Sequence, residues 1–67
     1  MLCKRLDGKY EEKLDVYWIA EYFEDPTNGL YEVEVFHHDV SRWFAANFNS
    51  LEEGQDAARE YYNNQTA

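Results

Sequence analysis

Two apolar-rich runs separated by a strong turn signal constrain the fold of this chain more than any other feature. Residues 14–23 are rich in β-branched and aromatic side chains, and residues 30–36 alternate apolar residues with Glu32 and Glu34. Both patterns are typical of β-strands. Residues 24–29 (EDPTNG) lie between them and combine Pro, Asn and Gly, which favour the backbone angles of a turn. The pattern therefore predicts a β-hairpin.

The hydrophobic pattern also predicts a register for this hairpin. Pairing Phe23 with Leu30 collects apolar and aromatic side chains on one face, which we expect to be the core. The pairs across that face would be Tyr22–Tyr31, Ala20–Val33 and Trp18–Val35. The opposite face would carry Glu21 across from Glu32, Ile19 across from Glu34, and several exposed aromatic side chains.

The C-terminal half predicts a third strand and a helix. Residues 37–41 form a connecting turn, and residues 42–48 form a strand, although Ala45-Ala46 would also suit a helix. Phe44, Ala46 and Phe48 would share one face of that strand. Ser50 and Glu53 have the spacing of a capping box, so a helix should run from residue 51 to about residue 62. Its apolar stripe comprises Leu51, Gly54, Ala58, Tyr61 and Tyr62.

The two ends of the chain are less regular. Residues 1–13 are charged and contain Gly8, so they predict either a frayed terminus or a short edge strand with a turn. Residues 63–67 form a polar tail that should fray. The predicted architecture is α+β, one domain over residues 1–67. It has a three-stranded antiparallel sheet, a short fourth N-terminal strand as an alternative, and one C-terminal α-helix packed on one face.

Stability must come from packing, because Cys3 is the one cysteine of the 67 residues and excludes an internal disulfide. Six Tyr, four Phe and two Trp supply a large buried area instead. A lone thiol suits a reducing compartment, and residues 1–6 lack the apolar stretch of a signal peptide. No apolar run is long enough to cross a membrane. We therefore expect a cytoplasmic protein.

Charge is strongly negative and unevenly distributed. The chain has six Lys and Arg against fourteen Asp and Glu, a formal net charge of −8. Residues 1–13 carry four cations and three acids and sum to +1, whereas residues 14–67 carry two cations and eleven acids and sum to −9. Such a surface repels nucleic acids and anionic membranes and attracts basic proteins. The alternative is that the acids only keep a small domain soluble.

The order of elements over residues 18–62, about two-thirds of the chain, resembles a known class of small domain. Three strands, the link FNSLEE at residues 48–53 and the alanines that follow are similar to the integrase arm-type and plant ethylene-response DNA-binding domains. The resemblance implies a helix lying across a three-stranded sheet. Those families read DNA with Arg, Lys and Trp on the exposed sheet face, where this chain has Glu21, Glu32 and Glu34. No DNA-contacting role is therefore carried over.

Catalytic and metal-binding patterns are weak. His37-His38-Asp39 should form a polar loop, because adjacent residues of an extended chain point to opposite faces and zinc needs three or four ligands. Ser50 is explained as a helix cap, and Cys3 has no positioned base. An enzyme or a metal site would need such residues in a suitable arrangement, which the sequence does not indicate. We therefore expect neither catalysis nor a metal or other cofactor.

The sequence favours a small acidic protein-binding module that inhibits or modulates a basic nucleic-acid-handling protein, with carboxylates imitating phosphates. In size and charge it resembles the acidic inhibitors of phages and mobile elements, including anti-CRISPR and anti-restriction proteins. The alternative is a structural subunit that forms a homodimer or larger oligomer through the aromatic sheet face. The candidate partner-binding residues are Tyr17, Glu21, Phe23, Glu32, Glu34 and Phe36 on the sheet and Glu52, Glu53, Asp56 and Glu60 on the helix.

Overall fold

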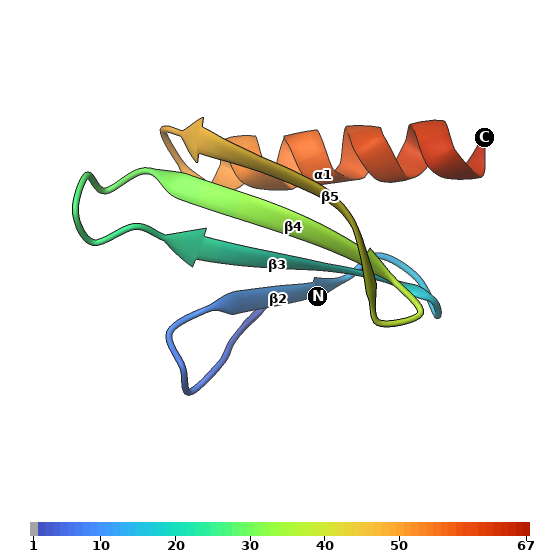
Figure 1. The fold of residues 1–67 in the computed structure, drawn as a ribbon, viewed down its shortest axis with the longest axis horizontal. Helices are drawn as coiled ribbons and strands as arrows, with labels where there is room; N and C mark the ends of the chain where they lie inside the picture. Colours follow the sequence, from blue (N-terminus) through green and yellow to red (C-terminus); the bar gives the residue numbers. More distant parts are fainter. Residues whose placement is uncertain (1) are drawn as a thin grey trace.

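Five strands follow one another along the chain, pair in that same order and are covered on one face by a single helix (Figure 1). The computed structural model describes residues 2–67; Met1 lies outside them. The α+β class and the C-terminal helix are confirmed, but the sheet has five antiparallel strands where three or four were predicted. The elements are β1 (Leu2–Lys4), β2 (Tyr10–Lys13), β3 (Trp18–Glu24), β4 (Tyr31–His37), β5 (Val40–Phe48) and α1 (Leu51–Thr66).

The additional strands β1 and β2 form a hairpin at the N-terminus. The backbone N–H of Arg5 donates to the carbonyl of Lys9 at 2.7 Å, and Gly8 supplies a left-handed residue with φ +89°. The side chain of Asp7 accepts the backbone N–H of Lys9 at 3.0 Å. Asp-Gly between two short runs is a strong hairpin signal. Of the two alternatives predicted for residues 1–13, the short edge strand with a turn is confirmed for residues 2–13, with a second strand beside it, and the frayed terminus is not found there.

The β3–β4 hairpin forms, but its register differs from the predicted one by two residues. Tyr22 lies opposite Val33, where Tyr31 was expected. The turn is shorter than predicted. Leu30 pairs with Asp25 and not with Phe23, since the backbone N–H of Asp25 donates to the carbonyl of Leu30 at 2.8 Å. Since side chains alternate with a period of two, this shift keeps each residue on its predicted face and changes only its partner.

Two irregularities bend β5. Arg42 is an extra residue between the pairs Phe36–Ser41 and Val35–Trp43. Ala46 and Asn47 together face a single residue of β4, and Asn47 has φ +70°. This second bulge turns Phe48 onto the helix side of the sheet while Phe44 stays on the other side. The prediction that Phe44, Ala46 and Phe48 share a face is therefore wrong, and the cause is a bulge.

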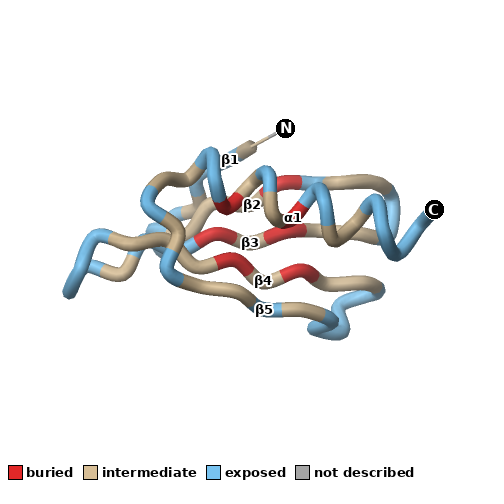
Figure 2. The backbone as a smooth tube through the Cα atoms, turned by 90° about the horizontal axis from the view of Figure 1, so that it is seen from above, coloured by how far each residue is buried: buried red, intermediate tan, exposed pale blue. Residues whose placement is uncertain are grey.

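The core lies between the middle of the sheet and the helix (Figure 2). Ala20, Tyr22, Val33 and Val35 are completely or almost completely buried beneath α1. The helix contributes Gly54 and Ala58, its two buried residues. With no side chain at Gly54, the ring of Tyr22 reaches the helix backbone closely. The predicted apolar stripe and its small residues are confirmed.

One acidic side chain is buried in this core. Glu12 on β2 is 6% exposed and accepts a hydrogen bond of 2.8 Å from the hydroxyl of Tyr22. Its other oxygen pairs with Arg59 of α1 at 2.5 Å. Burial, with the adjacent Glu12 carboxylate, raises the pKa of Tyr22 well above its ordinary value. The Glu12 carboxylate thus gives the buried hydroxyl of Tyr22 a hydrogen-bond acceptor that the apolar core would not otherwise provide.

The helix begins as predicted and ends later. Ser50 is the N-cap, with its hydroxyl accepting the backbone N–H of Glu53 at 3.2 Å, and the carboxylate of Glu53 accepts the backbone N–H of Asn49 at 3.1 Å. No Gly or Pro follows Gly54 to stop the helix, so it continues to Thr66 and includes most of the predicted tail. Within residues 2–67, no helix has the length and apolar character needed to span a membrane.

Replacing Gly54 by Ala should stabilise the protein. A Cβ at this position would meet the Tyr22 ring at 3.5 Å and the Phe48 ring at 3.8 Å, which are ordinary van der Waals distances. Removing a helical glycine gains about 1 kcal/mol. We expect Gly54→Ala to raise the free energy of unfolding by about 0.5–1 kcal/mol in urea titrations. Gly54→Leu, which must displace the Tyr22 ring, should lower it; equal behaviour of both variants would contradict the close packing.

Replacing Glu12 by Ala should destabilise the protein by about 2 kcal/mol, because the buried Tyr22 hydroxyl loses its acceptor. The ion pair adds less, since half of the Arg59 side chain is exposed to solvent. Glu12→Gln keeps an acceptor and should lose less stability. The matched control is Glu11→Ala, one residue away on the opposite face, which should change stability by less than about 0.5 kcal/mol. Urea denaturation of the three variants would rule out this role if Glu12→Ala and Glu11→Ala were equivalent.

Candidate functional site

The sheet face opposite α1 carries a row of acidic side chains that crosses the strands. Glu11, Glu21 and Glu34 lie directly opposite one another on β2, β3 and β4. Adjacent strands are about 4.8 Å apart, so these three carboxylates repel one another. The row continues into Phe44 on β5. This sheet face, which we call the open face, therefore concentrates negative charge that must be balanced by cations or by a partner.

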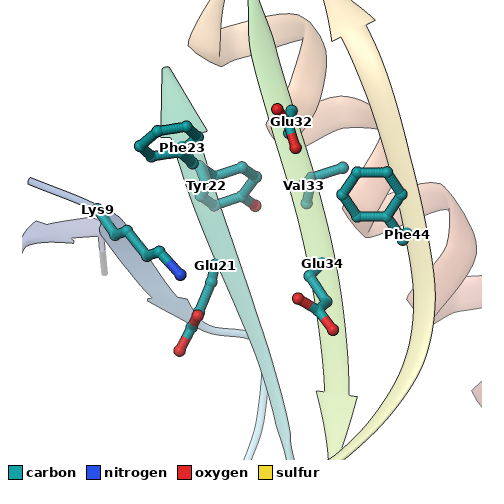
Figure 3. Close-up of a pocket in the computed structure, with 8 residues that line it drawn as sticks. All are labelled: Lys9, Glu21, Tyr22, Phe23, Glu32, Val33, Glu34 and Phe44. Carbon is teal, nitrogen blue, oxygen red and sulfur yellow. The ribbon is translucent and has the colours of Figure 1, made fainter. Parts of the chain in front are cut away.

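The N-terminal hairpin balances one half of the row. Arg5 donates from one nitrogen to Glu21 at 2.6 Å and to Glu11 at 3.4 Å, and from another nitrogen to Asp7 at 2.7 Å. The bond to Glu21 and its charge raise the pKa of Arg5. Lys9 also points toward Glu21 (Figure 3). Arg5 thus offsets part of the charge of the acids nearest to it, on β2 and β3.

The middle of the open face is a shallow depression of about 200 Å³, which Lys9 and Glu21 line on the side of the N-terminal hairpin (Figure 3). Glu32 and Glu34 of β4 lie between Phe23 of β3 and Phe44 of β5. Phe23 is directly opposite Glu32, and Phe44 is directly opposite Glu34. Within residues 2–67, no ion pair reaches either carboxylate at a distance of 4.0 Å or less. The rings of Phe44 and Phe23 are 57% and 37% exposed. Carboxylates and aromatic rings are therefore presented together to solvent.

The structure divides the predicted partner-binding residues among three places. Glu21, Phe23, Glu32, Glu34 and Phe36 lie on the open face, although Glu21 is engaged by Arg5. The helix acids lie across the molecule, since α1 packs on the other face of the sheet (Figure 1). Those acids are Glu52, Glu53, Asp56 and Glu60, all exposed, with Glu53 also engaged at the helix cap. A single flat partner cannot contact both surfaces.

Tyr17 lies at the third place, the end of the sheet where β3 begins and β4 ends. Its ring packs against His38 with a centroid distance of 4.5 Å, and the two histidine rings are 4.2 Å apart. His38 has φ +52°, a left-handed turn conformation, so its side chain does not alternate with that of His37. The expectation that the two rings point apart is wrong for this reason. In the described part of the chain, no three His, Cys, Asp or Glu side chains are grouped to hold a metal ion.

Sequence reasoning missed the residues that shape the open face. Arg5 and Lys9 reach it because residues 5–9 form a hairpin turn, and the Asp7-Gly8 dipeptide was the available signal. Phe44 was predicted to share a face with Phe48, and no simple sequence pattern predicts the bulge at Ala46–Asn47 that puts them on opposite faces. A search of protein-family models, curated proteins and solved structures found no match to this chain.

The histidine cluster gives the stability a predictable dependence on pH. His37 packs on Trp18 with a centroid distance of 4.5 Å, and this partial burial lowers the pKa of His37, helped by the charges of His38 and Arg42 and opposed by Asp15. In the unfolded chain His37 has its ordinary pKa of about 6.5, so it binds a proton more readily there than in the folded protein. Stability should be full above about pH 6.5 and should fall as the pH drops below it.

Urea titrations between about pH 7.5 and 5 should show this fall, and His37→Gln should remove most of it. His38→Gln is the matched control: it removes a neighbouring charge but leaves His37 packed on Trp18, so most of the fall should remain. Asp7 and Asp15, whose pKa values are lowered by hydrogen bonds, act at lower pH than this window. A flat profile in the wild-type protein would contradict the assignment.

Proposed function

We propose that this chain is a protein-binding module whose open face docks onto a basic protein. The observation that carries the proposal is the pair Glu32 and Glu34, carboxylates without a cation partner among the described residues, set beside exposed Phe23 and Phe44. Charge of this kind steers a positively charged partner to the surface. Desolvated aromatic rings then provide the short-range contact that holds it.

The partner class that fits best is a nucleic-acid-handling protein, with this chain as its inhibitor or modulator. A protein that holds phosphates presents Arg and Lys at a groove, and a net charge of −8 on 67 residues is complementary to that groove. Carboxylates at fixed spacing on a rigid sheet can occupy such a groove in place of phosphates. This is the behaviour of small acidic inhibitors of the phage and mobile-element type, such as anti-CRISPR proteins. The exposed free thiol of Cys3 suits action in a reducing cytoplasm.

Dimerisation through the same face is the alternative, and charge argues against it. A two-fold contact would bring Glu32 and Glu34 of one copy toward the acids of the other. Exposed Phe23 and Phe44 would be buried, but like charges brought together in an interface cost several kcal/mol. Light scattering should therefore show a monomer mass at all concentrations, whereas a concentration-dependent mass would favour the dimer.

Charge reversal separates the open face from the general acidity of the chain. The double variant Glu32→Lys/Glu34→Lys should lose at least about tenfold in affinity for captured basic proteins while keeping the wild-type circular dichroism spectrum. The matched control, Glu52→Lys/Glu60→Lys, changes the net charge by the same amount on the opposite side of the molecule and should keep most of the binding.

The measurement is a pull-down with each variant as bait at roughly 0.05 M and 0.5 M salt, followed by identification of the captured proteins and competition with duplex DNA. Wild-type bait should retain basic nucleic-acid-binding proteins at low salt only, and DNA should displace it from them. If the open-face variant and the helix variant capture the same proteins equally, the open face is not the site. If capture does not favour basic proteins, the partner class is wrong.

A further inference from the structure

The open face already binds one guanidinium group, that of Arg5. A single nitrogen of Arg5 lies 2.6 Å from Glu21 and 3.4 Å from Glu11, so one planar cation spans the carboxylates of two neighbouring strands. A second nitrogen reaches Asp7 at 2.7 Å. Carboxylates held at strand spacing therefore suit the forked donors of an arginine side chain.

The acidic row extends one strand beyond the reach of Arg5. Glu34 is the next member of the row, directly opposite Glu21, and Glu32 lies on the same face about 6.7 Å further along β4. Lys9 lines the same depression, but it approaches Glu21 from the side of the N-terminal hairpin and does not lie between Glu32 and Glu34 (Figure 3). The two carboxylates of β4 thus offer a second cation position on the same surface.

Aromatic rings flank this second position on both sides. Phe44 is the neighbour of Glu34 on β5, and Phe23 is the neighbour of Glu32 on β3. A guanidinium is planar and weakly hydrated, so it can stack on a ring while its N–H groups bond a carboxylate. A lysine ammonium can pair with the carboxylate, but it is not planar and is more strongly hydrated, so it gains less from lying against a ring. The volume of about 200 Å³ is below the roughly 300–1,000 Å³ of small-molecule sites and suits one side chain.

We infer that the part of the depression between Phe23, Glu32, Glu34 and Phe44, on the side away from Lys9, receives an arginine side chain of the protein partner. The guanidinium lies between the two rings and bonds the carboxylates of β4, as Arg5 bonds those of β2 and β3. The inference rests on the proposed function, because it names the group of the basic partner that this face recognises. It predicts a preference for arginine over lysine at equal charge.

Two synthetic peptides of equal length and charge, one containing arginine and the other lysine, test the inference on the purified protein. Titrations followed by backbone amide NMR at low salt should give an affinity about two- to fivefold higher for the arginine peptide, the range expected for cation–π contact at an exposed site. The largest changes in amide chemical shift should occur at Glu32, Glu34 and Phe44.

Variants of the ring then separate stacking from charge. Phe44→Leu keeps an apolar side chain at a half-exposed position and should abolish the preference for arginine while leaving the lysine peptide unaffected. The control Val40→Ala changes an exposed apolar residue of β5 that lies outside the depression, and it should keep the preference. Equal affinity of both peptides for the wild-type protein, or retention of the preference in Phe44→Leu, overturns the arginine site while leaving the basic-partner proposal standing. Failure of both peptides to bind at low salt overturns both proposals.

Discussion

The buried contact between Tyr22 and Glu12 ties the three parts of the molecule together. Tyr22 packs its ring against Gly54 of the helix and donates its hydroxyl to Glu12 on the N-terminal hairpin, which in turn pairs with Arg59 of the helix. A sheet and a helix built from 67 residues bury a limited area and have a thin stability margin, and Cys3 is free, so no disulfide adds to it. Packing and one satisfied polar group therefore hold the hairpin, the central strands and the helix in a fixed relation.

That relation determines the charge of the open face. Because Glu12 anchors β2 beside β3, the turn of the same hairpin carries Arg5 onto the acids of the opposite face. Arg5 pairs with the acids of β2 and β3, and among residues 2–67 the acids of β4 are left without an ion pair beside Phe23 and Phe44. The uneven charge of the sequence, +1 in the first thirteen residues and −9 in the rest, thus becomes a face whose charge is partly offset on β2 and β3 and remains anionic on β4.

Periodic sequence patterns predicted the faces of the strands well, whereas irregularities at single residues were not predicted. Alternation placed Glu21, Glu32 and Glu34 on the exposed face even though the register of the hairpin was off by two residues, because a shift of two preserves the face. The helix start followed from Ser50 and Glu53. The bulge at Asn47 and the burial of Glu12 depend on long-range pairing, which one sequence does not reveal. The missed hairpin differs, since Asp7-Gly8 carried a local signal for it.

Both edges of the sheet are poorly suited to pairing with another strand, which leaves the open face as the surface for the proposed partner. β1 is three residues long and carries Lys4, features that protect an edge from pairing with another strand. β5 is nine residues long, but Arg42 and the Ala46–Asn47 pair interrupt its ladder and leave only a short regular stretch around Phe44. Bulges of this kind turn an edge away from strand addition. Phe44, on that regular stretch, directs its ring onto the open face beside Glu34. The two bulges that protect the edge thus lie on either side of Phe44, which lines the depression. The same irregular strand therefore protects the edge of the sheet and presents an aromatic ring beside the acids of the open face.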